Sequence, residues 1–470
     1  MRFNRCAIAV LFMCMATSLW AADKYAIKVQ APDLKLEKLY LGQYYMGKLY
    51  AQDSLQLDKK GKGVFTAEEK LPQGMYVFYL SNGKYADLLI GDDQEFSVQL
   101  DTVQMAKNMR IKDAAQSADF LAYTLFLGSQ QEKMNQYNEQ YKQANEEQKK
   151  VLQANMDLLS VEVRQFQDSL IAKYPDGMLG LFIKGLLLPT MPQWNDSTHC
   201  QNVDSCKAMH RYLFYKKHYW DNLNLSDVRT FRTPYIANTL TTYLDKVLLQ
   251  INDSIIPSAL DMVEKSRGND TTFQIIASHL LNYAVKSKIM GMDNLMVELG
   301  KRYYLSGVAT WADSTLLSNL KNEIHKIERS LIGMTAHNVP LATEDGQYHY
   351  LYDMGGTQLT VLYFYEPSCG HCRKKTPVLA EFAKKYQNDP RIKVIAVYML
   401  EDQQEWQDFV QKNDMSALIN VWDPKRVSNY WYWFDTSTTP MMYVMDENKE
   451  IFAKKIDVET LERIAQHELK

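Results

Sequence analysis

The chain has 470 residues, of which 46% are hydrophobic and 23% are charged, and its formal net charge is −3. This length suffices for about three domains of ordinary size, and the apolar content excludes disorder as the dominant state. A weakly acidic chain without a long run of lysine and arginine lacks the basic surface of nucleic-acid-binding proteins, so we expect no nucleic-acid partner.

The N-terminal residues 1–22 have the three-part order of a secretory signal peptide. Two arginines lie among the first five residues, residues 6–20 form an uncharged apolar run, and Ala21 and Ala22 are small residues suited to cleavage. The run is too short to span a bilayer comfortably. We therefore expect a secreted, periplasmic protein. The alternatives are an uncleaved membrane anchor and a lipid anchor on Cys14, which the bulky residues before that cysteine disfavour.

Residues 23–110 alternate between short β-type runs and turn signals. Residues 25–29 and 96–100 show period-two hydrophobicity, and turn-forming stretches such as residues 81–83 separate the runs. This pattern predicts an antiparallel β-sandwich. No acid, histidine or cysteine groups converge in it, so we interpret this domain as a binding or spacer module.

Residues 111–332 change to a helical pattern. Apolar residues recur at helical spacing before and after the almost wholly polar stretch 138–150, which predicts one or two long amphipathic helices reaching into solvent. Further helical segments follow, with turn signals at 268–270 and 291–293. The sequence therefore predicts a central all-α domain.

Four cysteines remain after removal of the signal peptide, in two close pairs: Cys200 with Cys206, and Cys369 with Cys372. In an oxidising compartment, closely spaced pairs are usually disulfides. We expect a structural disulfide between Cys200 and Cys206, which lie in a polar loop. Two nearby histidines make a zinc site an alternative, although the spacing fits no closed zinc pattern, and free thiols are another.

Residues 333–470 show an α/β pattern. The β-branched and aromatic run 359–365 is typical of a strand buried in a central sheet. The sequence Cys-Gly-His-Cys follows it directly, and an apolar helical face comes next. The remaining predicted elements are strands at 394–398 and 418–422, a hairpin pairing 441–445 with 450–454, and a helix at 458–468.

Three features of this last domain resemble the thioredoxin fold of secreted TlpA-like thiol-disulfide oxidoreductases. Cys369 and Cys372 lie at a strand-to-helix junction, Pro377 lies five residues beyond the second cysteine, and Thr439-Pro440 precedes a strand. A zinc site would need a second ligand pair in this domain, and the sequence has none, so we expect no metal and no cofactor. The order of the whole chain also resembles secreted redoxins with upstream β-sandwich and helical domains of unknown function.

The position of the cysteines assigns their roles in thiol–disulfide exchange. Cys369 at a helix N-terminus would face unpaired N–H groups that stabilise its thiolate, so we predict it to be the nucleophile. Cys372, one turn further, would resolve the mixed disulfide. Gly370-His371 resembles the dipeptide of protein disulfide isomerases rather than that of thioredoxin, and a protonated His371 would further favour the Cys369 thiolate. The alternative for His371 is a solvated loop side chain.

The resemblance also implies roles for residues outside the cysteine motif. Thr439 would pair through its backbone with an extended substrate segment, and Pro440, in a cis peptide bond, would keep metal ions from bridging the thiols. One position departs from the family: Tyr363 stands where thioredoxins carry a buried aspartate that handles the proton of the resolving thiol. Glu366 is a candidate to replace that aspartate.

These observations predict an extracytoplasmic enzyme that exchanges disulfides with protein thiol or disulfide substrates, with a membrane electron donor or acceptor as partner. The direction of electron flow stays open, because the dipeptide favours an oxidant or isomerase and the TlpA-like resemblance favours a reductant. The alternative is a binding or scaffold protein whose C-terminal domain has only a regulatory redox role. A peroxiredoxin-type peroxidase is disfavoured, because Glu366 stands where that family needs a threonine.

Overall fold

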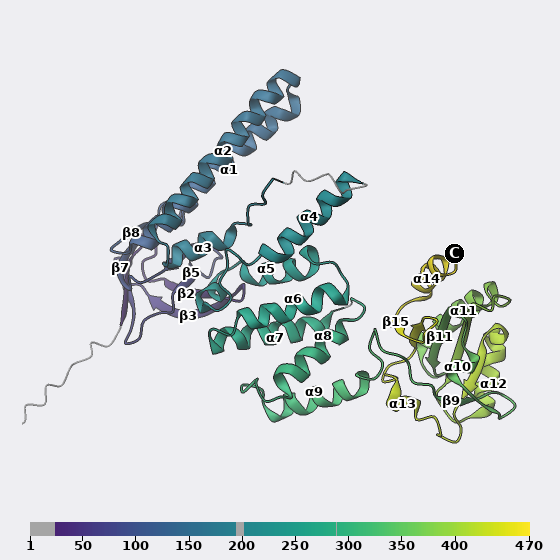
Figure 1. Cartoon of the computed structure of the whole chain (residues 1–470). Helices are drawn as coiled ribbons and strands as arrows, with labels where there is room; N and C mark the ends of the chain where they lie inside the picture. The colour runs from purple at the N-terminus through teal and green to yellow at the C-terminus, as the bar shows by residue number, and fades with distance from the viewer. Residues whose placement is uncertain (1–23, 194–201, 288) are drawn as a thin grey trace, which may run out of the picture. The chain divides into compact units, whose positions relative to one another are not determined.

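The computed structural model describes residues 24–193, 202–287 and 289–470 (Figure 1). These described residues fall into two compact units. The first comprises residues 24–190, 219–223 and 228–240, and the second comprises the described residues within 191–218, 224–227 and 241–470. The predicted signal peptide, residues 1–22, lies outside the described residues and stays a prediction, as do the domain boundaries at 110/111 and 332/333. Within the described ranges, no helix has both the length and the apolar character needed to cross a membrane.

The N-terminal strands form two four-stranded sheets around one hydrophobic core. The strand orders are β4-β1-β7-β8 and β3-β2-β5-β6. Alternate side chains such as Ile27, Val29 and Phe78 are buried between the sheets, as the period-two pattern predicts. The strands are β1 (Tyr25–Gln30), β2 (Lys38–Tyr45), β3 (Lys48–Gln56), β4 (Lys62–Ala67), β5 (Gly74–Tyr79), β6 (Tyr85–Ile90), β7 (Glu95–Gln99) and β8 (Arg110–Lys112).

One strand pair departs from the antiparallel prediction. Strands β1 and β7 run parallel, with Ile27 opposite Phe96, whereas the other pairs in these two sheets are antiparallel. The cause is that β5 and β6 belong to the other sheet. The chain therefore returns to the first sheet running in the direction of β1.

The turn before β4 depends on a glycine and an aspartate. Gly61 has φ +69°, and a Cβ at this position would lie 2.0 Å from the carbonyl oxygen of Ala31, so only glycine fits. Asp58 Oδ1 accepts hydrogen bonds from the backbone N–H groups of Lys60 at 2.7 Å and Lys62 at 2.9 Å. The Asp58 carboxylate is thus engaged by its own loop.

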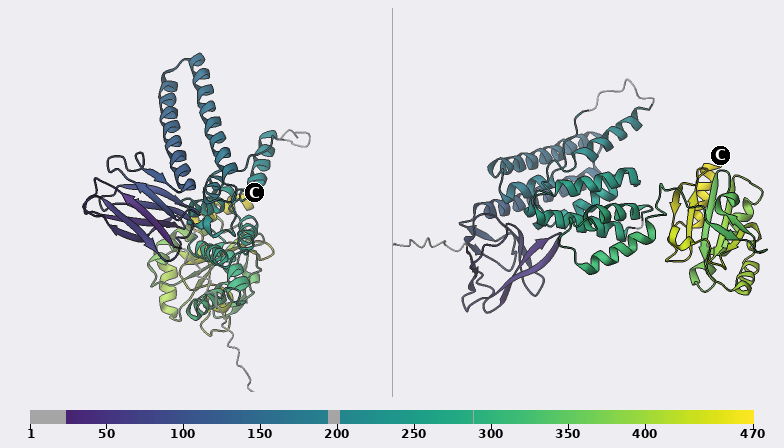
Figure 2. Two further views of the ribbon diagram at one scale, coloured as in Figure 1. Left: turned by 90° about the vertical axis from the view of Figure 1, so that its left-hand side faces the viewer. Right: turned by 60° about the horizontal axis from the view of Figure 1, so that its bottom comes forward.

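A helical hairpin packs on the outer face of the second sheet. Met75 and Leu89 of that sheet share a buried cluster with Phe120 and Phe182 of the helices. The turn of the hairpin lies inside the predicted polar stretch, where Asn145 caps the second helix in a reciprocal capping box. Figure 2 shows the two long helices of the hairpin side by side. The helices are α1 (Ala115–Gln143), α2 (Glu146–Lys173) and α3 (Met178–Leu186).

The second unit contains further helices, so the central region is helical as predicted. Helix α7 is capped by Asn269 and buries Phe273, Ile276 and Leu280 on one face. The helices of this unit are α4 (Val203–His218), α6 (Asn252–Lys265), α7 (Asp270–Lys286), α8 (Met292–Leu299) and α9 (Ser314–Ile327), and α5 (Ile236–Thr242) spans the boundary between the units.

A seven-stranded sheet organises the C-terminal α/β domain, in the order β10-β9-β13-β12-β11-β14-β15. The central strand β11 is buried along its whole length, parallel to β12 and antiparallel to β14. The elements are β9 (Pro340–Ala342), β10 (Tyr348–Tyr350), α10 (Leu351–Met354), β11 (Leu359–Tyr365), α11 (Gly370–Lys385), β12 (Ile392–Tyr398), α12 (Gln403–Lys412), β13 (Ile419–Trp422), α13 (Tyr430–Trp433), β14 (Met441–Met445), β15 (Ile451–Lys454) and α14 (Val458–Glu468). The predicted three-part fold is confirmed.

A buried polar cluster joins β15 to α8 within the second unit. Lys454 is only 2% exposed, and its Nζ lies 2.5 Å from Asp293 Oδ2. The same Nζ donates a hydrogen bond to the carbonyl oxygen of Ser330 at 2.9 Å. The Ser330 hydroxyl in turn lies 3.1 Å from the hydroxyl of Tyr443 on β14. The lysine charge is therefore buried with one carboxylate beside it.

Candidate active site

The two cysteines of the Cys-Gly-His-Cys motif lie where β11 ends and α11 begins. Cys369 is the N-cap residue of α11, and Cys372 lies one turn into the helix. A short loop connects the strand to the cap, and Arg373 Nη1 braces it by donating hydrogen bonds to the carbonyl oxygens of Pro367 at 2.8 Å and Ser368 at 2.9 Å. The position of Cys369 is thus fixed by the Arg373 hydrogen bonds to the preceding loop and by the start of α11.

The two thiols differ in exposure and in acidity. Both are free, with Cys369 partly exposed and Cys372 buried. Burial on its own raises the pKa of Cys369. Hydrogen bonds with Thr439, with Cys372 and with the backbone N–H of His371 outweigh burial, so the pKa of Cys369 lies below its ordinary value. Burial raises the pKa of Cys372 to about 11. The difference matches a nucleophilic first thiol and a protonated second thiol.

The loop before β14 places Thr439 and Pro440 against the first thiol. The Cys369 thiol donates a hydrogen bond to the carbonyl oxygen of Thr439 at 3.2 Å. The Thr439–Pro440 peptide bond is cis, as predicted. The Thr439 hydroxyl donates to Glu366 Oε1 at 3.0 Å. Two segments far apart in the sequence therefore meet at Cys369.

Asp435 stabilises that loop from inside the domain. Its carboxylate accepts hydrogen bonds from the backbone N–H of Ser437 at 3.1 Å and from the Ser437 hydroxyl at 2.5 Å, and it lies 3.2 Å from Lys455 Nζ. Burial alone raises the pKa of Asp435, but Ser437 and Lys455 lower it and prevail. The carboxylate is thus held ionised beneath the loop that carries Thr439.

Tyr363 fills the position where thioredoxins carry an aspartate. Its ring is buried, and its hydroxyl lies 3.0 Å from the hydroxyl of Thr376. Burial raises the pKa of Tyr363 far above its ordinary value, so the phenol stays neutral near neutral pH. A neutral phenol cannot take the proton of Cys372 there. Glu366 is the carboxylate that the structure brings into contact with the active-site loops.

Gly370 and His371 lie exposed in the first turn of α11. A Cβ on Gly370 would meet only the Arg373 guanidinium, at 3.7 Å, so the fold does not require glycine there. The backbone N–H of His371 contributes to the lowered pKa of Cys369. The tuning role of the His371 imidazole stays a prediction.

Of the second predicted cysteine pair, the structure describes only Cys206, which lies on a helix and not in the predicted polar loop. Cys206 lies in the first turn of α4. Cys200 lies outside the described residues, so the predicted disulfide with Cys206 stays a prediction. In the described ranges, no group of three or more His, Cys, Asp and Glu side chains is placed to hold a metal ion.

Comparison with known proteins assigns the C-terminal domain to a family. Residues 356–451 match the family model described as thioredoxin-like. This part of the chain belongs to the thioredoxin-like family. Residues 205–327 match a domain of unknown function, DUF5106. No curated protein matches the chain.

Solved structures that are similar to parts of the chain include proteins described as thioredoxin-like or as thiol-disulfide oxidoreductases. A "domain of possible thiol-disulfide isomerase" from Cytophaga hutchinsonii is 33% identical, over 29% of this chain and 92% of that chain, with a TM-score of 0.27. A thioredoxin-like protein from Bacteroides caccae is 18% identical over 60% and 98%, with a TM-score of 0.45. A thiol-disulfide oxidoreductase from Bacteroides fragilis is 18% identical over 28% and 98%, with a TM-score of 0.26.

Several residues of the thioredoxin-like domain support the site and were not predicted from the sequence. Arg373 braces the loop before Cys369, Thr376 holds the Tyr363 hydroxyl, and Asp435 orders the loop before Pro440. The arginine directly after the second cysteine was visible in the sequence as part of a basic run. Its contacts reach back five and six residues to backbone carbonyls, which no spacing rule indicated.

The pKa difference predicts selective alkylation of Cys369 in the reduced protein. The thiolate is the reactive form, and the pKa of Cys369 is lowered. Cys369 should therefore still react with iodoacetamide below pH 8.5, since the ordinary pKa of a cysteine thiol is about 8.5. Cys372, buried and with a raised pKa, should stay unmodified over the same range. Alkylation rates from pH 5 to 9, assigned to each cysteine by mass spectrometry, measure both. Equal rates at the two cysteines would contradict the assignment.

Proposed function

We propose that the chain is an extracytoplasmic thiol-disulfide oxidoreductase of the TlpA-like type, acting on protein substrates through Cys369 and Cys372. The observation that carries this proposal is the position of the Cys369 thiol. It caps a helix N-terminus, has a lowered pKa and lies 3.2 Å from the Thr439 carbonyl, beside Pro440. Helix N–H groups stabilise the thiolate that attacks a disulfide.

The proposed reduction proceeds in two exchanges. The Cys369 thiolate attacks one sulfur of a substrate disulfide, forming a mixed disulfide and releasing the other substrate sulfur as a thiolate. Cys372 then loses its proton and attacks Cys369 Sγ, which forms the Cys369–Cys372 disulfide and releases the second substrate thiolate. The substrate gains two electrons and the enzyme loses two. One substrate thiolate takes up the proton that Cys372 loses, and the other takes up a proton from solvent. Oxidation is the same sequence in reverse.

Neighbouring groups have specific parts in this scheme. Thr439 presents backbone polar groups beside Cys369, where an extended substrate segment would pair with them. Glu366, which accepts a hydrogen bond from Thr439, is the proposed acceptor of the proton that Cys372 loses. A membrane electron donor or acceptor would return the cysteines to their starting state.

Turnover of a model disulfide tests the proposal. The reduced full chain should reduce insulin, and the Cys369→Ser/Cys372→Ser double variant should show only the uncatalysed rate. The reduction potential of the pair then gives the direction. A value near −270 mV favours a reductant and a value near −180 mV an oxidant or isomerase, a difference of roughly 4 kcal/mol for two electrons. No turnover in either direction would favour the scaffold alternative, in which the double variant keeps its function.

A further inference from the structure

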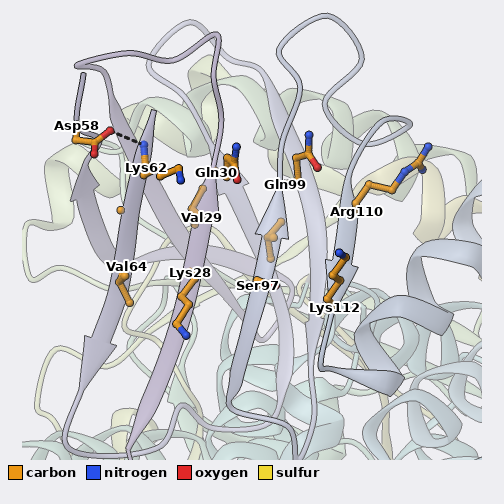
Figure 3. A pocket seen from close by; sticks show the side chains of 12 residues that line it. Lys28, Val29, Gln30, Asp58, Lys62, Val64, Ser97, Gln99, Arg110 and Lys112 are labelled. Carbon is orange, nitrogen blue, oxygen red and sulfur yellow. Dashed lines mark hydrogen bonds between the residues drawn. The ribbon is translucent and has the colours of Figure 1, made fainter. Parts of the chain in front are cut away.

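The first sheet of the N-terminal domain has a hollow on its solvent-facing side that the redox chemistry does not use. Its volume is about 510 Å³. Figure 3 shows the side chains that line it. They come from all four strands of the sheet and from the turn before β4, and most of them are exposed, whereas Val29 and Val98 are buried. These residues are Lys28, Val29, Gln30, Asp58, Lys62, Gly63, Val64, Ser97, Val98, Gln99, Arg110 and Lys112.

Strand register arranges the polar side chains in two rows across the sheet. One row runs through Lys62, Gln30, Gln99 and Arg110, because each is paired with the next by the strand register. The second row, two residues away along each strand, runs through Val64, Lys28, Ser97 and Lys112. Figure 3 shows both rows facing the same side. With strands about 4.8 Å apart, the first row spans about 14 Å from end to end.

The hollow is strongly cationic in a chain whose net charge is −3. Lys28, Lys62, Arg110 and Lys112 line it, and none of the four forms a side-chain ion pair with any described residue. The one acidic lining residue, Asp58, is engaged by backbone N–H groups of its own turn. The four cations therefore have their charge available for an anionic ligand.

We propose that this cationic hollow binds an extended acidic peptide segment. No aromatic side chain lines it, so a sugar ring or a nucleobase would find no stacking surface. In an extended peptide, alternate side chains lie about 6.8 Å apart, so carboxylates at positions i and i+4 span about 14 Å. Two such carboxylates are therefore as far apart as Lys62 and Arg110, the cations at the two ends of the first row. The amide groups of Gln30 and Gln99 then lie beneath position i+2 and can donate to a third carboxylate.

Fluorescence anisotropy with a labelled peptide of alternating glutamate and serine tests this proposal on the full chain. The peptide should bind at low ionic strength and dissociate as salt is added, since exposed charges are screened. Arg110→Gln/Lys112→Gln should weaken binding about tenfold, which corresponds to roughly 1.4 kcal/mol for the two lost exposed contacts together. The matched control, Lys35→Gln/Lys48→Gln, removes two exposed lysines outside the hollow and should leave binding unchanged.

Further measurements separate this peptide from other ligands and from misfolding. A peptide with glutamine in place of glutamate should not bind. If the double variant fails to fold, as judged by circular dichroism, Lys28→Gln replaces it and should also weaken binding. Equal weakening in the control variant, no binding at low salt, or tighter binding of a sulfated oligosaccharide than of the acidic peptide would overturn the proposal. Each result is independent of disulfide exchange and is unchanged by Cys369→Ser.

Discussion

The Cys372→Ser variant should accumulate covalent complexes with substrate proteins. The first exchange needs only the Cys369 thiolate, whose lowered pKa and position at the start of α11 are independent of the Cys372 side chain except for one hydrogen bond. The second exchange needs Cys372, and a serine hydroxyl cannot attack the mixed disulfide. Each encounter with a substrate disulfide therefore ends at the intermediate, and turnover falls to about the uncatalysed rate.

Non-reducing electrophoresis of cells expressing the variant, followed by mass spectrometry, measures this outcome. The complexes should disappear on addition of dithiothreitol and should be absent from the Cys369→Ser/Cys372→Ser variant, which keeps the fold but lacks the nucleophile. Complexes that persist in the double variant would have to form through another cysteine. Their absence from Cys372→Ser would count against Cys369 as the nucleophile.

Asp293→Ala should lower the free energy of unfolding of the second unit by about 3–5 kcal/mol. Removing one partner of a buried ion pair leaves the other charge without compensation. Lys454 is only 1% exposed at its side chain and has Asp293 Oδ2 at 2.5 Å, so its charge would remain buried with only the Ser330 carbonyl beside it. Urea denaturation measures the loss.

One further variant and the pH dependence control that measurement. Asp261→Ala removes an exposed ion pair with Lys265 and should cost less than about 1 kcal/mol. Burial lowers the pKa of Lys454, so the unfolded chain binds more protons than the folded one at high pH. Stability of Asp293→Ala should therefore rise as the pH increases toward the unfolded lysine value of about 10.4. Equal costs for Asp293→Ala and Asp261→Ala would contradict the argument.

The elements of the thioredoxin-like domain could be predicted because its buried strands carry a strong local signal. Residues 359–365 are a run of leucine, β-branched and aromatic residues, and the observed β11 covers the same residues. The cysteine motif was placed correctly at the start of a helix, since a strand and an amphipathic face flank it. Local pattern therefore located the helix N-terminus at which Cys369, the proposed nucleophile, lies.

Contacts between distant segments could not be predicted in this way. Glu366 and Thr439 are 73 residues apart, and nothing in their surroundings indicates that they form a hydrogen bond. Lys454 is the last residue of the short strand β15, but its partner Asp293 lies in another part of the chain. The parallel pairing of β1 with β7 depends on which sheet the intervening strands join. The hydrophobic period of a sequence predicts which face of a helix or strand is buried. It does not predict which other element packs against that face.

The same limit applies to the central helices. Their period predicts helices over 111–332, and helices are found there. Helices α1 to α3 pack with the β-sandwich in the first unit, whereas α6 to α9 belong to the second unit. A helical pattern does not say on which body a helix will pack, so this division became visible only in the structure.

In the proposed mechanism, the buried state of Cys372 sets how long each client stays attached. With a pKa of about 11, on the order of one Cys372 thiol in ten thousand is ionised at pH 7 in the reduced protein. A mixed disulfide on Cys369 would therefore wait for deprotonation of Cys372 before release, unless a neighbouring base shortens the wait. During that interval a tethered client would have time to rearrange, and its own thiols would compete to resolve the bond. The acidity of one buried thiol would thus divide clients between those that leave by internal isomerisation and those that leave after a net two-electron transfer.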